Sequence, residues 1–362
     1  MDKLKPFTKK IPETEKAEFN GGAKFCNGDT VMARITPCLE NGKTAYVDML
    51  DDGEIGFGST EFIVMRAKAG ISDPQFVYYT AINPTFRNVA IKSMVGSSGR
   101  QRVQQSVLEE LELSVPGLDE QRRIGAFLAE LDEKIALNNK INDNLEQQAQ
   151  SYFQELFVDN ADPEWTTGTI SDLGTVVGGS TPSKAKPEYY TESGIAWITP
   201  KDLSNNKSKF VSHGENDITE LGLRNSSASI MPEGTVLFSS RAPIGYIAIA
   251  AGEVTTNQGF KSVVPKPEIG TPFVYFFLKN TLPVIEGMAS GSTFKEVSGS
   301  TMKNVPAVIP DAETLAKFSD FCAPIFAQQR ILEEQNQSLA TLRDNLLPKL
   351  MSGEIDVSAV QL

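Results

Sequence analysis

Few residues in this 362-residue chain have types and spacings that could support catalysis. His213 is the only histidine, so a Ser–His–Asp triad would have to use it, and no histidine-rich metal site is possible. The polar stretch 211–217 around it is typical of a surface loop. The sequence contains no GxxxxGK[ST] phosphate loop and no strand–GxGxxG–helix unit. We therefore predict a non-catalytic protein that uses no metal and no cofactor.

Polar residues in loops suggest a different chemistry, the binding of DNA. Arg and Lys suit guanine, Asn and Gln suit adenine, and Ser and Thr suit phosphates or base edges. Each such residue could equally be an ordinary loop residue, so the set is a hypothesis. The candidate DNA-binding residues are Arg34, Thr36, Lys43, Ser59, Thr60, Arg100, Arg102, Thr181, Lys184, Ser240, Arg241, Asn257, Gln258, Ser292 and Lys295.

Two long helices are predicted to position these loops. Apolar residues recur every three or four positions through 119–157 and again through 311–351. This period is typical of helices that pack along a shared seam, and two unrelated surface helices are the alternative. The predicted seam, which is also the predicted docking surface for other subunits, contains Ile124, Leu128, Leu131, Ile135, Leu145, Phe318, Ile325, Leu332, Leu339 and Leu346.

Four residues in the helical segments make further predictions. Asn138, Asn142 and Asn336 fall at seam positions, where a buried asparagine fixes the register of a helix pair. Pro324 has no N–H group to donate, so we expect the second helix to kink or restart there.

The segments before the two helices repeat each other. Residues 30–32 correspond to 235–237, residues 76–79 to 273–276, and Val103 to Val297. This order predicts two copies of a globule followed by a helix. Residues 107–116 are expected to return to the core of the first globule. In the repeat frame Met1 falls near Asn205, so the first globule is expected to be truncated, smaller, or completed by another chain.

Charge and composition restrict the function classes. Residues 119–162 carry 4 basic and 10 acidic groups, and residues 311–362 carry 4 and 8, so ten units of the net charge of −12 belong to these segments. The nearly neutral globules could present a basic face to DNA, whereas acidic helices suit protein partners or solvent. No signal peptide or membrane span is found, and three scattered cysteines suit a reducing compartment, so a cytoplasmic location is expected.

Several motifs resemble the specificity (S) subunit of type I restriction–modification enzymes. Residues 25–43 and 56–62 are similar to one class of its target-recognition domains. Residues 116–124 resemble the junction into the first conserved helix of the family, and residues 342–355 resemble the end of its second. The resemblance covers nearly the whole chain.

The resemblance implies an α+β protein with two similar mixed α/β target-recognition domains, separated by two long helices that pair as an antiparallel coiled coil. Each domain would read half of a split target in double-stranded DNA, and the helices would set the unread spacer. Two methyltransferase subunits would dock on the helices, and restriction subunits would join them. The implied segments are a first domain at 1–118, spacer helix 119–158, a second domain at 159–310, spacer helix 311–352 and tail 353–362.

The first domain departs from the family pattern. Family members begin with a tryptophan-bearing strand and a GxTP-type loop, which this chain carries only at Trp165 and residues 179–182. The alternative function is therefore a truncated S-like adaptor or antagonist, which binds methyltransferase subunits but reads only a half-site. An enzyme with an unrecognised active site is the second alternative.

Overall fold

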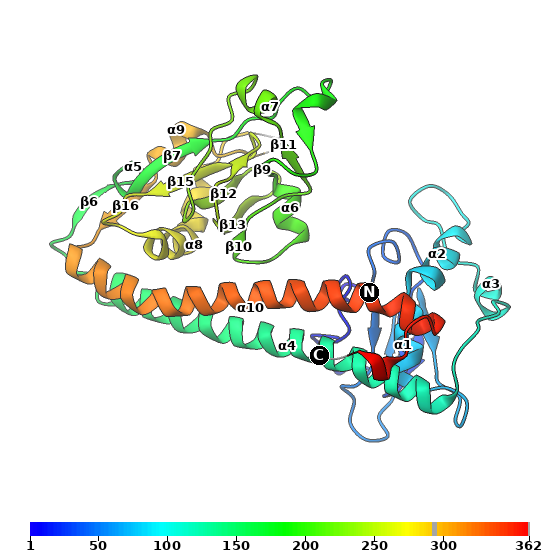
Figure 1. Cartoon of the computed structure of the whole chain (residues 1–362). Helices are drawn as coiled ribbons and strands as arrows, with labels where there is room; N and C mark the ends of the chain where they lie inside the picture. Colours follow the sequence, from blue (N-terminus) through cyan, green and yellow to red (C-terminus); the bar gives the residue numbers. More distant parts are fainter. Residues whose placement is uncertain (292–294, 361–362) are drawn as a thin grey trace. The chain divides into compact units, whose positions relative to one another are not determined.

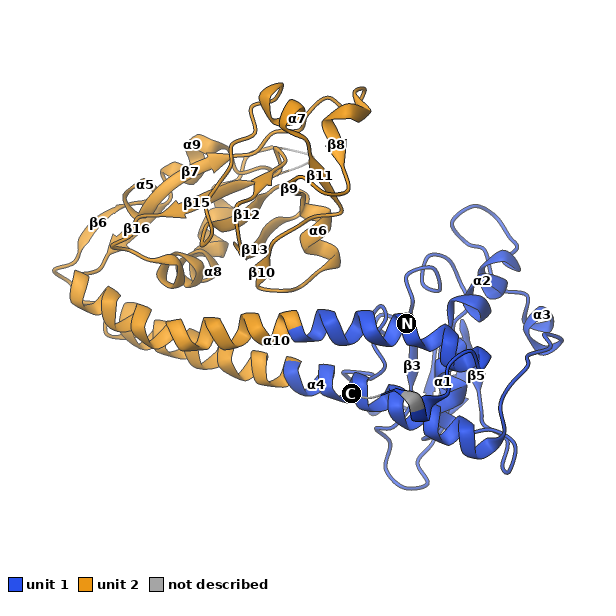
Figure 2. Cartoon of the chain, viewed as in Figure 1, with its two compact units in different colours: residues 1–138, 335–362 blue, residues 139–334 orange. Residues whose placement is uncertain are grey.

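The computed structural model describes residues 1–291 and 295–360, and the chain divides into two compact units. Unit 1 contains residues 1–138 and 335–362, and unit 2 contains residues 139–334 (Figure 2). The long helices α4 (Leu118–Gln154) and α10 (Ala312–Ser352) each contribute a segment to both units. In the described part of the chain, no helix is both long enough and apolar enough to span a bilayer.

Unit 1 is built on a three-stranded antiparallel sheet of order β3-β2-β5 (Figure 1). All four residues of its central strand β2 are buried. A turn at 39–42 lies between β2 and β3, with Gly42 at a φ of +71°. The elements are β1 (Ala23–Phe25), β2 (Thr30–Ala33), β3 (Thr44–Tyr46), β4 (Gly56–Gly58), β5 (Phe62–Met65), α1 (Pro74–Ile82), α2 (Pro84–Lys92) and α3 (Gln105–Glu109).

Local capping defines the helices beside this sheet. The Asp73 carboxylate accepts a hydrogen bond from the Phe76 amide at 3.0 Å, and Pro74 occupies the first turn of helix α1. Asn83 ends α1 and caps α2 by accepting from the Thr85 amide at 2.9 Å. The Asn-Pro pair therefore starts a second helix, which the sequence analysis missed.

Unit 2 contains a five-stranded sheet of order β10-β13-β12-β15-β7 and a four-stranded sheet of order β14-β9-β11-β8. A two-stranded pair, β16 with β6, completes its strands among the described residues. The elements after α4 are the π-helix η1 (Glu155–Asp159), β6 (Thr166–Thr169), α5 (Ile170–Leu173), β7 (Gly174–Gly178), η2 (Pro187–Tyr189), β8 (Tyr190–Thr191), β9 (Ile195–Ile198), α6 (Pro200–Asn205), β10 (Phe210–Val211), β11 (Asn216–Ile218), α7 (Glu220–Arg224), β12 (Val236–Ser240), β13 (Ile244–Ala250), β14 (Thr255–Thr256), β15 (Lys261–Pro265), α8 (Thr271–Gly287), α9 (Gly299–Lys303) and β16 (Pro306–Ile309).

The predicted repeat is present in the strand order of the two units. Strand β2 lies between β3 and β5, and β12 lies between β13 and β15, each time with antiparallel partners. The bridges outside the named strands also correspond. Arg102 bridges Ile35 and Val95 in unit 1, and Glu296 bridges Arg241 and Ser290 in unit 2. Arg102 and Glu296 are therefore equivalent positions.

The two copies differ where the second carries extra strands. In unit 2, β16 pairs with β6 and β15 pairs with β7. No described strand of unit 1 pairs with residues 111–115, and Leu113 and Val115 are 42% and 51% exposed. The prediction that 107–116 returns to the core holds for Leu108 and Leu111, which pack against the buried cluster around Met32 and Val103. It is wrong for Leu113 and Val115, because this part has no partner strand.

The predicted seam residues make helix–helix contacts within each unit. In unit 1, Ile124, Leu128 and Leu131 of α4 share a buried cluster with Leu347 and Leu350 of α10, and Leu339 and Leu346 pack against it. In unit 2, Ala149 and Phe153 of α4 share a cluster with Phe318, Cys322 and Ile325 of α10, and Leu145 packs against it. Leu332 is buried and Ile135 half-buried.

Two other expectations about the helices have different outcomes. Asn138 is fully buried, and its amide group donates to the side-chain oxygens of Asn336 at 2.9 Å and Gln335 at 3.2 Å. Asn142 is half-buried, and its backbone carbonyl accepts from the Gln329 side chain of α10 at 3.1 Å, so all three predicted asparagines lie between the helices. The predicted restart at Pro324 is wrong, because α10 continues through it. Proline lacks only one donor, and packing on either side maintains the helix.

Candidate nucleic-acid interface

Three charged residues meet at one end of the sheet in unit 1. Arg34 follows β2 and Glu61 precedes the antiparallel strand β5, so the strand pairing brings them together. The Glu61 carboxylate accepts from Arg34 Nε at 3.2 Å and from Arg102 Nη2 at 2.7 Å. The Arg102 hydrogen bond, opposed by partial burial, lowers the pKa of Glu61. We call Arg34, Glu61 and Arg102 the unit 1 trio.

Several other predicted residues of unit 1 lie beside this trio. Thr36 exchanges hydrogen bonds with the backbone of Gln101, its hydroxyl accepting from the Gln101 amide at 3.0 Å. The Ser59 hydroxyl accepts from the Glu61 amide at 3.1 Å. Thr60 directly precedes Glu61, Arg100 lies two residues before Arg102, and both side chains are exposed. Lys43 is different, because its amine donates to the carbonyl of Met1 at 3.2 Å.

The corresponding end of the sheet in unit 2 carries a second trio. Arg241 follows β12, and Lys261 begins the antiparallel strand β15. Glu296 forms ion pairs with Arg241 at 3.6 Å and with Lys261 at 3.9 Å. Burial lowers the pKa of Lys261. We call Arg241, Lys261 and Glu296 the unit 2 trio, of which only Arg241 was predicted.

The two trios have the same composition, but their charged groups come from different positions of the repeat. Each has two cations around one carboxylate. In unit 1 the carboxylate precedes β5, and in unit 2 it lies on the loop after α8. The position that is a cation in unit 1, Arg102, is therefore an anion in unit 2, Glu296. The other members are not equivalent, because the backbone hydrogen bonds of Arg34 correspond to those of Ser240 and the bridge of Ile35 corresponds to that of Arg241. Two sites built from different positions of the same backbone favour different ligands.

Unit 2 also has a polar pocket beside its trio, with a volume of about 480 Å³. Charged groups of both signs line it, together with amides and hydroxyls. Five predicted residues belong to its wall: Thr181, Lys184, Arg241, Asn257 and Gln258.

Close backbone packing shapes the wall of this pocket. The Asn257 carboxamide oxygen accepts from the Gly259 amide at 2.8 Å and fixes a tight turn. The Thr181 hydroxyl donates to the Gln258 side chain. A Cβ at Gly179 would overlap the carbonyl oxygen of Asn257, so glycine lets the GxTP-type loop lie against this turn.

Three predicted residues of unit 2 lie elsewhere or cannot be placed. Ser240 is fully buried, and its hydroxyl donates to the carbonyl of Gly259 at 3.1 Å, so its prediction as a surface contact is wrong. Lys295 is exposed. Ser292 lies outside the described residues.

Sequence reasoning missed two buried lysines, one in each unit. Lys9 is 8% and Lys209 is 7% exposed, and each lies among aromatic rings. The sequence does carry a signal for Lys209, which directly precedes the two apolar residues of strand β10, Phe210 and Val211. Lys9 has no comparable signal in the sequence.

The comparisons with known proteins identify the class. The family model described as "Type I restriction modification DNA specificity domain" matches residues 7–147 and 163–342. The chain belongs to this family.

The chain is also similar to individual specificity subunits and to a solved structure. The chain is 39% identical over 194 residues to the type I restriction enzyme MjaIX specificity subunit of Methanocaldococcus jannaschii, a match that spans 51% of this chain and 45% of that protein. It is 24% identical over 404 aligned positions to the HindI specificity subunit of Haemophilus influenzae, covering 91% and 86% of the two chains. The crystal structure of a type I restriction–modification S subunit from M. genitalium aligns with a TM-score of 0.56 at 18% identity, covering 97% and 90%. That likeness concerns the fold.

Proposed function

We propose that this chain is a non-catalytic DNA-recognition subunit that reads a split target, one half with each unit. The observation that supports the proposal most is the repeated sheet end with its charged trio, present once in each unit and different in its charges. Arginines and lysines held by a carboxylate keep a defined geometry and retain donors for guanine edges or phosphates. The family to which the chain belongs supports the same role.

We further propose that α4 and α10 act together as an antiparallel spacer. Within each unit, a segment of α4 packs against a segment of α10. Each helix is continuous, with 37 residues in α4 and 41 in α10. At about 1.5 Å per residue, helices of this length span somewhat under two turns of duplex. Two readers on such a spacer would bind cooperatively only to half-sites at a matching separation.

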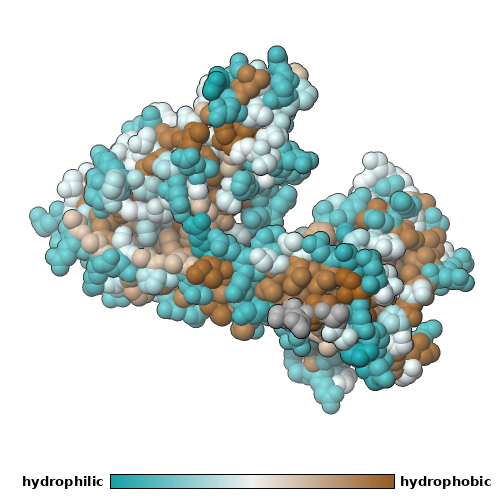
Figure 3. Space-filling model, in the orientation of Figure 1, coloured by the Kyte–Doolittle hydropathy of each residue, from teal (hydrophilic) through white to brown (hydrophobic). Residues whose placement is uncertain are grey.

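Protein partners are the third part of the proposal. The helices expose Leu137 and Ile141 on α4 and Ile331 and Leu342 on α10. Brown hydrophobic residues gather over the α10 part of unit 1 in Figure 3. We assign these surfaces to methyltransferase subunits, with restriction subunits joining the assembly.

A gel-shift experiment tests the proposed function. The chain, with its methyltransferase partner, is mixed with duplexes that carry both half-sites, either half-site alone, or neither. The split target should bind about 10²–10⁴-fold more tightly than either half, as expected for linked sites. Equal affinity for all four duplexes would contradict it.

The half-site adaptor remains a second candidate because of one observation. No described residues of unit 1 form counterparts of β6, β7 and β9, so the pocket beside the unit 2 trio has no equivalent wall there. If this candidate is correct, the split target and the unit 2 half-site will bind equally well.

A further inference from the structure

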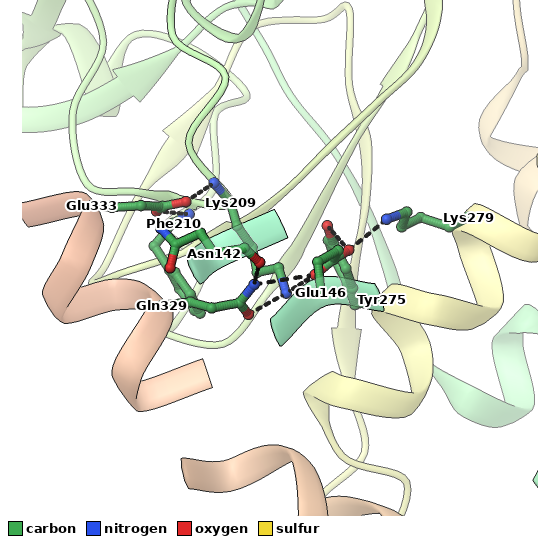
Figure 4. Close-up of polar contacts among 8 residues, drawn as sticks. All are labelled: Asn142, Glu146, Lys209, Phe210, Tyr275, Lys279, Gln329 and Glu333. Atoms are coloured by element: carbon green, nitrogen blue, oxygen red, sulfur yellow. Dashed lines mark hydrogen bonds and ion pairs between the residues drawn. The ribbon is translucent and has the colours of Figure 1, made fainter. Parts of the chain in front are cut away.

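A buried polar cluster in unit 2 joins strand β10 and helix α8 to both long helices (Figure 4). The Lys209 amine donates to Gln329 Oε1 at 2.6 Å and forms an ion pair with Glu146. The Glu333 carboxylate accepts from the backbone amides of Lys209 and Phe210 at 2.7 and 3.0 Å. Side chains of α4 and α10 therefore hold the start of a sheet strand directly.

Aromatic rings enclose the same amine. Lys209 Nζ lies 4.1 Å from the ring centre of Phe326, 4.8 Å from that of Tyr275 and 5.4 Å from that of Phe276. The Tyr275 hydroxyl donates to Glu146 at 3.2 Å, and Lys279 is the second cation on that carboxylate. The lysine is thus fixed by cation–π contacts as well as by charge.

Unit 1 contains an equivalent cluster built from different residues. Lys9 Nζ lies 5.3–5.7 Å from the ring centres of Tyr46, Tyr78 and Tyr79. Lys9 Nζ donates to the Tyr79 hydroxyl at 3.5 Å, and this hydroxyl donates to Asp132 of α4 at 2.6 Å. Arg343 of α10 donates to the same carboxylate, also at 2.6 Å.

The backbone shows that the two lysines occupy the same place in the repeat. The carbonyl of Lys9 accepts from the Tyr46 amide of β3, and the carbonyl of Lys209 accepts from the Ile249 amide of β13. Strands β3 and β13 are equivalent neighbours of β2 and β12. Each lysine therefore lies beside the equivalent strand of its unit. Lys209 forms an ion pair with Glu146 of α4, and Lys9 is connected to Asp132 of α4 through the Tyr79 hydroxyl.

Burying these charges gives little net stability. Desolvation lowers the pKa of both lysines, although Glu146 and Asp132 oppose that effect. Apolar side chains of similar volume would stabilise such a site as well or better, so a buried ionic group is better explained by a role in geometric specificity. A hydrophobic contact can slide, whereas a lysine held by several acceptors and rings has one position.

We propose that Lys9 and Lys209 are positioning residues, each of which fixes the orientation of its sheet on the α4–α10 segment of the same unit. The proposal rests on the proposed function where it concerns DNA, because a fixed orientation would define one spacer length.

Lys209→Met in the full chain tests the proposal, with Lys207→Met as the matched control. Lys207 lies two residues away on an exposed position. Glu146 keeps Lys279 in the variant, so no carboxylate is left unpaired. Hydrogen exchange, which needs no DNA, is measured first. Amides of 208–212 should exchange at least about tenfold faster in Lys209→Met, while those of β12 are unchanged. Equal rates in the two variants would overturn the proposal.

The second measurement uses selection from a duplex library with two randomised blocks and every spacer up to one helical turn. Lys209→Met should recover the same half-sites as the unmodified chain but over several spacer lengths, whereas a merely destabilised protein would keep one spacer.

If the unmodified chain recovers no split target, the proposed function fails and hydrogen exchange alone decides the inference. If Lys209→Met does not fold, Tyr275→Phe is used, and a single unchanged spacer with unchanged exchange overturns the inference.

Discussion

At the residue scale, each unit surrounds one carboxylate with two cations at the end of its central strands. These carboxylates belong to Glu61, which precedes β5, and to Glu296, which lies on the loop after α8. The loop position that is a cation in unit 1, Arg102, is therefore an anion in unit 2, Glu296. Under the proposed function, this one change of sign at an equivalent position would help the two units to read unlike half-sites. The carboxylates orient the arginines and also reduce the net positive charge of each trio.

The unit 1 trio predicts a pH dependence of stability. The folded-state pKa of Glu61 is lowered, chiefly by the Arg102 hydrogen bond. Its contribution to stability is therefore present above the unfolded-state pKa of about 4.3 and is lost as the pH falls through the folded-state value. Glu61→Gln should remove this contribution, by about 0.5–1 kcal/mol at neutral pH.

The measurement is urea unfolding followed by far-UV circular dichroism from neutral to acid pH. Glu40→Gln, at an exposed position, is the control and should follow the unmodified chain. If the difference in the free energy of unfolding between Glu61→Gln and the unmodified chain is the same at every pH, the trio does not supply this contribution to stability.

Arg241 carries the corresponding prediction for DNA binding in unit 2. Arg241→Ala should weaken binding to the split target by about 1–3 kcal/mol and relax base preference in one half-site only. Arg224→Ala is the control, because Arg224 is exposed and pairs with Glu220 on α7, outside the pocket wall. Fluorescence anisotropy at fixed salt measures both variants. A uniform loss over all sequences would assign Arg241 to phosphate contact instead.

At the element scale, the α4 and α10 segments of unit 1 are joined to each other by a buried ion pair as well as by an apolar seam. Asp132 and Arg343 have side chains only 8% and 12% exposed in unit 1. Removing one member of a buried pair leaves the other poorly compensated. Arg343→Met should therefore destabilise unit 1 by about 3 kcal/mol.

Both tryptophans, Trp165 and Trp197, belong to unit 2, which makes this prediction easy to localise. The far-UV unfolding midpoint should fall while the tryptophan fluorescence transition changes little. Arg122→Met, which breaks an exposed pair with Asp119, should alter stability by less than about 0.5 kcal/mol. Equal effects of the two variants would show that burial of the Asp132–Arg343 pair is unimportant.

The sequence was most informative about elements with strong periodicity. The three- and four-residue spacing predicted both long helices and most buried seam residues, because burial along a helix requires that period. Two other expectations failed, the restart of the helix at Pro324 and the return of Leu113 and Val115 to the core, because tertiary contacts or their absence decide these outcomes. Composition could indicate polar loops but not distinguish Ser240, which is buried, from Arg241 beside it.

The charged clusters could not be predicted because their members are distant in the sequence. Glu296 reaches Arg241 and Lys261 only through sheet pairing, and Lys209 meets Glu146 and Gln329 only when the helices pack on the sheet. No local pattern encodes such contacts. The two-copy repeat was detectable, and it now shows which of these clusters correspond.

At the scale of the whole molecule, the central claim is that α4 and α10 determine the distance between two half-sites. The residues between the two lysine clusters allow a direct test. Removing 134–140 from α4 together with 334–340 from α10 deletes one heptad from each helix and retains Asp132, Glu146, Glu333 and Arg343. Asn138 and Asn336, which are hydrogen-bonded to each other, leave together.

The decisive measurement is selection of split targets by this double deletion in complex with the methyltransferase partner. Seven residues correspond to about 10 Å of helix, or roughly three base pairs. We predict that the deletion selects the same two half-sites with a shorter spacer, and that deleting either heptad alone abolishes split-target binding. Selection of the original spacer by the double deletion would contradict the account.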